Sequence, residues 1–285
     1  MKTNEISIRD PYILFKDGAY YLYGTRAYNF GAGVGGFDVY VSSDLENWSE
    51  PIQCFDSEKY GLNRDVNWAP EVHEFRGKYY AFVTFTQPNN MRATYSLVSD
   101  SLTGPFVPCG TDPLTPKDWF SLDGTLYVDP DGVPYLVFCH EHEQISDGTI
   151  CYVQLNEDLS APVGEVVTLF SAKESGWADP YGPENHHITD GPFMHRREDG
   201  ELYMIWSTFI EGRYAVCLVK FKDGKLGMDF EHLKPLLDSD GGHGMIFSDE
   251  SHRYLTYHAP NILGQEHPYF CYLETSGDTF NLVER

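Results

Sequence analysis

Three aspartates recur at similar places in the chain, each directly before a short apolar run that ends in a turn. Asp10 begins DPYILFKDG, Asp123 begins DGTLYVDPDG and Asp190 begins DGPFMHRREDG. Aspartates that only form turns lie inside the hairpin, as Asp17 and Asp131 do. Carboxylates brought close together shift each other's pKa, so that one is protonated near neutral pH while another is ionised. The three aspartates are therefore candidates for general acid and general base catalysis.

A repeated pattern of strand, turn and aromatic strand must position these residues. Its five copies begin at Asp10, Pro70, Asp123, Asp190 and His243, and their aromatic strands contain Tyr20, Tyr79, Tyr135, Tyr203 and Tyr254. Further strand-like segments, which end in S-D-x-L or E-D-L turns, follow the hairpins. We therefore predict an all-β protein, a five-bladed β-propeller with four-stranded antiparallel blades around a central axis. We expect residues 1–285 to form this single domain, with no accessory domain, and a β-sandwich is the alternative.

The composition agrees with a β-rich protein and excludes several classes of partner. Hydrophobic residues make up 41% of the chain and aromatic residues 15%, while 26 glycines and 17 prolines suit many tight turns. The formal net charge of −23 repels nucleic-acid phosphates and anionic lipids, so we expect neither as a partner. The opening MKTNEISIRD does not resemble a signal peptide, which favours a cytoplasmic location.

The six cysteines are scattered along the chain and include no C-x-x-C pair. Several lie in apolar, strand-like runs, such as YLVFCH around Cys139. We therefore expect buried, reduced thiols and neither a zinc site nor a redox pair.

The innermost strand of a propeller blade lines the axis, so the residue that begins each one should point into a pocket at one end. We expect this set to comprise Asp10, Glu71, Asp123, Asp190 and His243. The antiparallel second strands return to the same mouth, where we expect Thr25, Thr86, His140, Glu141, Thr208, Tyr257 and His258. His243 lies between glycines, and its axial place suggests that it holds water or a structural calcium ion bound mainly through waters. We expect no cofactor to be required.

Five stretches of the chain resemble glycoside hydrolase family 43, a family of inverting five-bladed propeller enzymes that act on arabinose- and xylose-containing polysaccharides. These stretches are RDPYILFKDGAYYLYGT, NWAPEVHEFRGKYYAFVTF, SLDGTLYVDPDGVPYLVF, TDGPFMHRREDGELYMIWS and GGHGMIF. The resemblance implies that Asp10 is the general base and that Asp123 orients the acid and adjusts its pKa. In an inverting hydrolase the acid and base carboxyls lie about 6.5–9.5 Å apart.

The identity of the general acid stays open at this point. The family usually has a glutamate in an E-G-P motif, whereas this chain has Asp190-Gly191-Pro192. Asp190 is the acid by its position in the motif, and Glu141, at the end of a second strand, is the rival. A third alternative is that the protein binds sugar without hydrolysing it.

Six residues near the predicted mouth are expected to bind sugar: Trp68, Tyr28 and Phe30 by stacking, and Glu71, His140 and His258 as polar groups. The resemblance predicts an inverting hydrolase that removes α-L-arabinofuranosyl or β-D-xylosyl units from plant cell-wall oligosaccharides, which would be its partners. The alternatives are a catalytically silent carbohydrate-binding propeller and a retaining, fructan-type propeller hydrolase. Retention requires carboxyls about 5–5.5 Å apart.

Overall fold

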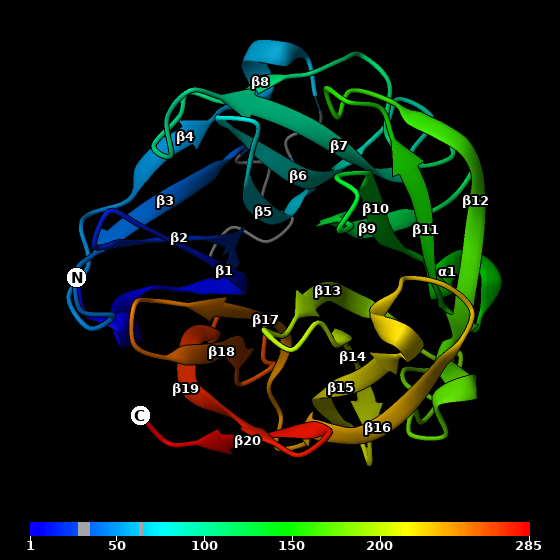
Figure 1. Cartoon of the computed structure of the whole chain (residues 1–285). Helices are drawn as coiled ribbons and strands as arrows, with labels where there is room; N and C mark the ends of the chain where they lie inside the picture. Colours follow the sequence, from blue (N-terminus) through cyan, green and yellow to red (C-terminus); the bar gives the residue numbers. More distant parts are fainter. Residues whose placement is uncertain (28–34, 63–64) are drawn as a thin grey trace.

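Five four-stranded antiparallel sheets make up the computed structural model, which describes residues 1–27, 35–62 and 65–285. Viewed along the axis, the sheets are arranged radially, and the first strand of each lies nearest the centre (Figure 1). Each blade is a contiguous segment of the chain whose strands follow one another from the axis to the rim. The predicted five-bladed β-propeller is confirmed.

The strands of the blades are as follows, from axis to rim. Blade 1 contains β1 (Ile8–Lys16), β2 (Ala19–Arg26), β3 (Phe37–Ser42) and β4 (Ile52–Phe55). Blade 2 contains β5 (Asn67–Phe75), β6 (Lys78–Thr86), β7 (Arg92–Ser99) and β8 (Val107–Pro108), and blade 3 contains β9 (Ser121–Val128), β10 (Pro134–His140), β11 (Thr149–Leu155) and β12 (Pro162–Ser171). Blade 4 contains β13 (Asp190–Arg196), β14 (Leu202–Ile210), β15 (Arg213–Phe221) and β16 (Phe230–Leu237), and blade 5 contains β17 (Gly242–Ser248), β18 (Arg253–Ala259), β19 (His267–Ser276) and β20 (Thr279–Val283).

The helices are short. They are α1 (His142–Ile145) and the 3-10 turns η1 (Thr3–Glu5), η3 (Ser57–Tyr60), η4 (Ala172–Ser175) and η5 (Lys222–Gly224). In the described part of the chain, none is long and apolar enough to cross a membrane.

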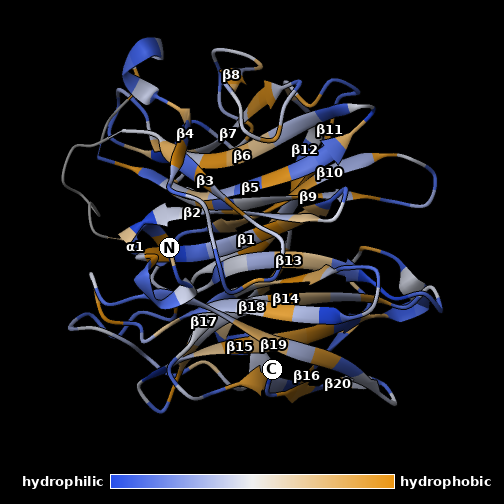
Figure 2. Cartoon of the chain, turned by 90° about the vertical axis from the view of Figure 1, so that its left-hand side faces the viewer, coloured by the Kyte–Doolittle hydropathy of each residue, from blue (hydrophilic) through white to orange (hydrophobic). Residues whose placement is uncertain are grey.

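Apolar side chains fill the space between neighbouring blades. Because each blade is covered on both faces, its middle strands are apolar without alternation, and residues 202–209 of β14 are all buried. Trp206 on this strand is fully buried and packs edge-on against Phe170 of blade 3, with ring centroids 5.4 Å apart. In side view the apolar colours run within the stacked strands, while many connecting loops are hydrophilic (Figure 2). All six cysteines are unpaired, and four of them are buried.

Blades 5 and 1 meet where the ring closes. The described sheets share no strand at this junction, and side chains connect the two blades. Arg9 Nη1 lies 2.7 Å from Glu266 Oε1, and the Glu266 side chain is fully buried. His267 Nδ1 lies 2.8 Å from the carbonyl oxygen of Ile6. β1 therefore lies beside β17 and β18 of blade 5 at this junction (Figure 1).

Each innermost strand has a β-bulge near its start, visible as a shift in the register with the second strand. One residue of each bulge has a positive φ, and these bulge residues are Asp10 (53°), Ala69 (46°), Asp123 (57°), Gly191 (49°) and His243 (47°). A bulge allows two successive residues to face the same side of the strand. The axial pocket can therefore receive a bulge residue together with the residue before it.

These bulges correct the predicted equivalence of the strand starts. Glu71 lies two residues after its bulge residue, and Asp190 lies one residue before its own. The sequence does contain the correct signal, because proline follows the bulge residue in blades 1, 2 and 4 and glycine follows it in blades 3 and 5. Alignment on that proline or glycine, instead of on the acidic residues, gives the observed register.

Candidate active site

A cavity of about 150 Å³ lies at the axis where the innermost strands begin, and all five blades contribute to it. Its lining comprises Arg9, Asp10, Trp68, Leu122, Asp123, Glu141, His142, Asp190, Tyr214 and His243. In blades 1 and 3 the bulge residue and the residue before it both line the cavity. The cavity thus brings together the three predicted aspartates, the rival Glu141, Trp68 and His243.

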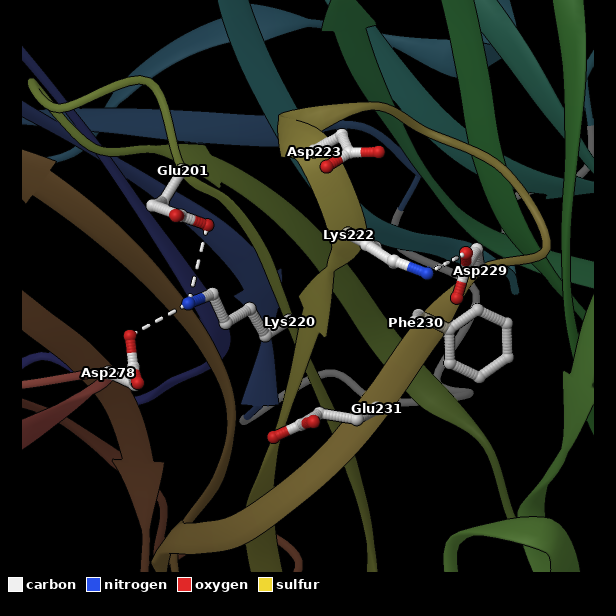
Figure 3. A pocket seen from close by; sticks show the side chains of 8 residues that line it. All are labelled: Glu201, Lys220, Lys222, Asp223, Asp229, Phe230, Glu231 and Asp278. Carbon is white, nitrogen blue, oxygen red and sulfur yellow. Dashed lines mark hydrogen bonds and ion pairs between the residues drawn. The ribbon is translucent and has the colours of Figure 1, made fainter.

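A larger cavity, of about 360 Å³, lies over the outer strands of blade 4 and has a different chemical character (Figure 3). Lys220 lies 2.8 Å from Asp278 and 3.4 Å from Glu201, and Lys222 lies 2.9 Å from Asp229. Three of its five carboxylates form these pairs with lysines, and such exposed pairs perturb each other only weakly. The axial cavity, where the carboxylates are buried, is therefore the candidate active site.

Asp10 is held in its ionised form. Thr25 Oγ1 donates a hydrogen bond of 2.6 Å to its Oδ2, and His243 Nδ1 lies 3.2 Å from its Oδ1. Burial raises the pKa of Asp10, but the charges of His243 and Arg9 and the Thr25 hydrogen bond outweigh this effect and bring the pKa below its usual value. An ionised, buried carboxylate is suited to accept a proton from water.

His258 holds the backbone of Asp10 through a hydrogen bond. Its Nδ1 accepts a 3.1 Å hydrogen bond from the backbone N–H of Asp10, and its side chain is completely buried. Burial lowers the pKa of His258 to about 3, so the ring is neutral and can act as this acceptor. The predicted contact of His258 with sugar is thereby corrected, because the ring lies where a sugar does not reach.

Asp123 lies in a different environment from Asp10. Its Oδ2 accepts a 3.0 Å hydrogen bond from the backbone N–H of Gly191 and lies 3.7 Å from His243 Nδ1. Burial raises the pKa of Asp123 to about 8, the charges of Asp190 and Asp10 raise it as well, and His243 opposes the rise. Two aspartates of one cavity are thus shifted in opposite directions, an arrangement that separates acid from base functions.

His243 lies among the three aspartates of the cavity. Burial lowers the pKa of its imidazole, but the charges of Asp10, Asp123 and Asp190 outweigh burial and raise it. A Cβ atom on Gly191 would lie 2.7 Å from the His243 ring, so only glycine fits beside it.

The expected calcium ion, bound mainly through waters, stays a prediction. The Nδ1 atom of His243 faces carboxylate oxygens of Asp10 and Asp123, as the N–H of an imidazolium does. Among the described residues, no three His, Cys, Asp or Glu side chains are grouped so that they could hold a metal ion.

The two candidate acids differ in their partners. Asp190 is half-buried, and its Oδ2 accepts one hydrogen bond, of 3.0 Å, from the Tyr214 hydroxyl. Glu141 is 3% exposed, and each of its oxygens accepts a 2.7 Å hydrogen bond from Arg92. Burial raises the pKa of Glu141 to about 7, although Arg92 opposes the rise. The arginine occupies both oxygens of Glu141, whereas among the described residues only one oxygen of Asp190 accepts a hydrogen bond, which leaves the other to face a substrate.

Trp68 is the predicted stacking residue that lines the cavity. The guanidinium of Arg92 lies 5.7 Å from the centroid of its ring, so Arg92 contacts both Trp68 and Glu141. Tyr28 and Phe30 lie outside the described residues, and their roles stay predictions.

Glu71 and His140 do not line this cavity, and their roles in sugar binding stay predictions. Glu71 is buried, and its Oε2 lies 3.0 Å from Nε2 of His73. His140 stacks on Trp119, with ring centroids 4.0 Å apart, and its Nε2 lies 2.9 Å from Gln144 Oε1. Both side chains are thus engaged in structural contacts.

An exposed aromatic residue at the rim had no signal in the repeat pattern. Tyr181 is 44% exposed and stacks on Phe209 at 3.5 Å between centroids, with the planes 13° apart. Phe209 in turn packs 5.1 Å from Tyr214, which lines the cavity. The same loop reaches the cavity a second time, because the ring of His186 lies 5.6 Å from that of His142. An aromatic face fixed in this way is suited to stack on a sugar ring.

Comparison with known proteins adds three findings. The model of the family Glycosyl hydrolases family 43 matches residues 4–275. The extracellular endo-α-(1→5)-L-arabinanase 2 of Bacillus subtilis (strain 168) is 24% identical over 276 residues, which cover 87% of this chain and 55% of that protein, so the chain spans about half the length of this relative. The crystal structure of an endo-arabinase from Bacteroides thetaiotaomicron VPI-5482 is 34% identical, with a TM-score of 0.89, and the match covers 98% of this chain and 99% of that one.

A more distant structure has a different printed activity. The α-L-arabinofuranosidase CtGH43 from Clostridium thermocellum ATCC 27405 is 19% identical, with a TM-score of 0.70 over 97% of this chain and 93% of that one. At this level of identity the likeness shows the fold alone.

Proposed function

This chain belongs to glycosyl hydrolases family 43, and we propose that it cleaves α-(1→5)-linked L-arabinose chains internally and with inversion. The observation that carries the proposal is the axial cavity, in which Asp10 is held ionised while the pKa of Asp123 rises to about 8. The two endo-arabinan enzymes among the compared proteins support the choice of substrate, one of them matching nearly the whole of both chains. This proposal replaces the expected removal of single arabinofuranosyl or xylosyl units.

In the proposed reaction, Asp10 accepts a proton from a water molecule as the water oxygen bonds to the anomeric carbon. The bond from that carbon to the leaving sugar oxygen breaks at the same time, and Asp190 donates its proton to this oxygen. Because water enters on the face opposite the leaving group, the configuration inverts. Exchange with solvent then removes the proton from Asp10 and returns one to Asp190.

The other residues of the cavity support this exchange. The His243 imidazolium, 3.2 Å from Asp10, compensates the charge of the ionised base. Asp123 holds the peptide N–H directly after Asp190, which keeps the proposed acid in place. Glu141 and Arg92 form a doubly hydrogen-bonded ion pair that packs beside Trp68. In the proposed reaction this pair holds the side of the cavity in place, and Glu141 is not the acid.

The test is a substrate panel run on the wild type beside Asp10→Asn. The panel comprises linear α-(1→5)-arabinan, arabino-oligosaccharides, aryl α-L-arabinofuranoside, aryl β-D-xyloside and xylo-oligosaccharides. We expect mixed arabino-oligosaccharides from arabinan, little release from the aryl glycosides, and loss of all activity in the variant. Proton NMR of the first product should show the inverted anomer.

Other outcomes would refute parts of the proposal. Release of arabinose alone would indicate an exo-acting enzyme, and a retained anomer would indicate the retaining mechanism. Binding of arabinan without cleavage would indicate a silent carbohydrate-binding propeller.

A further inference from the structure

The backbone N–H groups of the bulge residues join neighbouring blades around the axis. At four of the five junctions the acceptor is a side chain on the second strand of the preceding blade: Asp10 with His258 (3.1 Å), Ala69 with Thr25 (2.7 Å), Asp123 with Thr84 (3.0 Å) and His243 with Ser207 (2.8 Å). Hydroxyl oxygens and a neutral imidazole nitrogen are good acceptors. These hydrogen bonds therefore connect each of these blades to the one before it.

The junction between blades 3 and 4 departs from this pattern. The strand register places Cys139 opposite Leu122, just as it places Thr25 opposite Arg9, so Cys139 occupies the acceptor position of blade 3. A thiol sulfur is a weak acceptor. The N–H of Gly191 donates instead to Asp123 Oδ2, at 3.0 Å.

Cys139 is a neutral thiol at this position. Its side chain is completely buried. Burial raises the pKa of the thiol well above its usual value, and the charges of Asp123 and Asp190 raise it further. It therefore has no thiolate with which to compete for the N–H of Gly191.

Blade 1 shows what a hydroxyl does at the equivalent place. Thr25 Oγ1 accepts from the N–H of Ala69 and donates to Asp10 Oδ2, so the hydroxyl lies between Asp10 and the next blade. In blade 3 the thiol of Cys139 instead has the Thr189 hydroxyl as a hydrogen-bond partner, and the carboxyl group of Asp123 contacts the next blade itself. The peptide group that it binds joins Asp190 to Gly191, directly beside the proposed acid.

We propose that Cys139 is a positioning residue: because its thiol is a weak acceptor, the N–H of Gly191 is left to the carboxyl group of Asp123, which thereby fixes the backbone of Asp190. The effect on catalysis rests on the proposed function, since it requires Asp190 to be the acid. The choice of hydrogen-bond partner does not, because it follows from the geometry alone.

The experiment compares three substitutions of Cys139. Cys139→Ser introduces a hydroxyl that can accept from Gly191 and donate to Asp123, as Thr25 does in blade 1, whereas Cys139→Ala and Cys139→Val introduce no acceptor. We expect Cys139→Ser to lower kcat on arabinan roughly ten- to hundred-fold with little change in KM, since small displacements of a catalytic group have effects of this order. We expect Cys139→Ala and Cys139→Val to retain most of kcat.

This order of effects separates positioning from packing. If Cys139 only filled space, the alanine variant, which loses the most volume, would be the most impaired. Cys217→Ser serves as the matched control, because Cys217 is 1% exposed in β15 and its substitution also introduces a buried hydroxyl. It should lower stability and leave kcat unchanged.

A crystal structure of Cys139→Ser provides a readout that does not depend on activity. We expect the introduced oxygen within hydrogen-bond distance of Gly191 N, and Asp123 Oδ2 beyond it. An unchanged bond between Gly191 and Asp123, or equal losses of kcat in the serine and alanine variants, would overturn the proposal. If the wild type cleaves no glycan, the proposed function fails, and the crystal structure alone decides the role of Cys139.

Discussion

Thr25→Val should move the acid limb of the pH–rate profile to higher pH. The substitution keeps the shape of the side chain but removes the hydroxyl that donates to Asp10 at 2.6 Å. This bond stabilises the ionised form of Asp10, so its loss raises the pKa of the base. The rate falls on the acid side as the base becomes protonated, and a higher pKa therefore shifts that limb upward.

The size of this shift follows from the burial of the pair. Thr25 is 2% exposed, and the valine methyl group fills the place of its hydroxyl, so no water takes over this hydrogen bond to Asp10. A hydrogen bond to a charged group contributes about 1.5–3 kcal/mol, and one pKa unit corresponds to about 1.4 kcal/mol. We therefore expect the acid limb of kcat/KM on arabinan to shift by about 1–2 pH units.

The same substitution also has a cost in stability. The N–H of Ala69 loses its acceptor, which should lower the free energy of unfolding by about 1–3 kcal/mol in urea denaturation. The folded-state pKa of Asp10 is lowered, so the stability due to its ionisation is present at neutral pH and lost as the pH falls. The variant should lose part of this pH-dependent contribution.

Thr25→Ser is the control, since it keeps the hydroxyl. It should retain the wild-type acid limb and most of the stability. An acid limb that does not move in Thr25→Val, with arabinan cleavage intact, would show that Asp10 is not the base or that the hydroxyl does not control its pKa.

Three further predictions concern the acid, the central glycine and the rim. Asp190→Asn should lower kcat on arabinan far more than on arabino-oligosaccharides with an activated aryl leaving group, which needs little protonation, whereas Glu141→Gln should affect both substrates alike; equal leaving-group dependence in steady-state kinetics would contradict this assignment. Gly191→Ala should reduce kcat by at least about tenfold, because its Cβ would lie 2.7 Å from the His243 ring; a fully active variant of unchanged melting temperature would show that the ring moves freely. Tyr181→Ala should raise KM for long arabino-oligosaccharides several-fold without changing kcat for short ones, and a uniform loss across chain lengths would exclude a stacking role.

The repeats in the sequence were sufficient to predict the blades but not the register within them. Each repeat has a strand of similar length, an obvious turn and a tyrosine, and these features indicate strands regardless of detail. The distance from the bulge residue to the repeat tyrosine varies, however, from 10 residues in blades 1 and 2 to 12 in blades 3 and 4. An alignment on acidic residues therefore selected Glu71 and Asp190 as equivalents of Asp10.

The partners of the candidate site were harder to predict than its carboxylates. Asp10, Asp123 and Asp190 recur before strands, so their convergence follows once a propeller is assumed. In the run YLVFCH, Cys139 looks like an ordinary core thiol. Its proposed role depends on the absence of the hydroxyl that Thr25 has at the equivalent position of blade 1, and a single repeat does not show this. The bond between Arg92 and Glu141 joins residues 49 positions apart on different blades, and no local pattern indicates it.

The junction between blades 5 and 1 passes through the candidate site, and this has a consequence for the order in which activity arises during synthesis. Asp10 is made among the first residues of the chain, but its contacts with His243 and His258 depend on the fifth blade. When the ribosome has synthesised four blades, Asp10 is already present, but His243 and His258, whose imidazoles contact it, are not. Nascent and truncated chains should be inert toward glycans, and the capacity for hydrolysis should appear only when the last blade docks against the first.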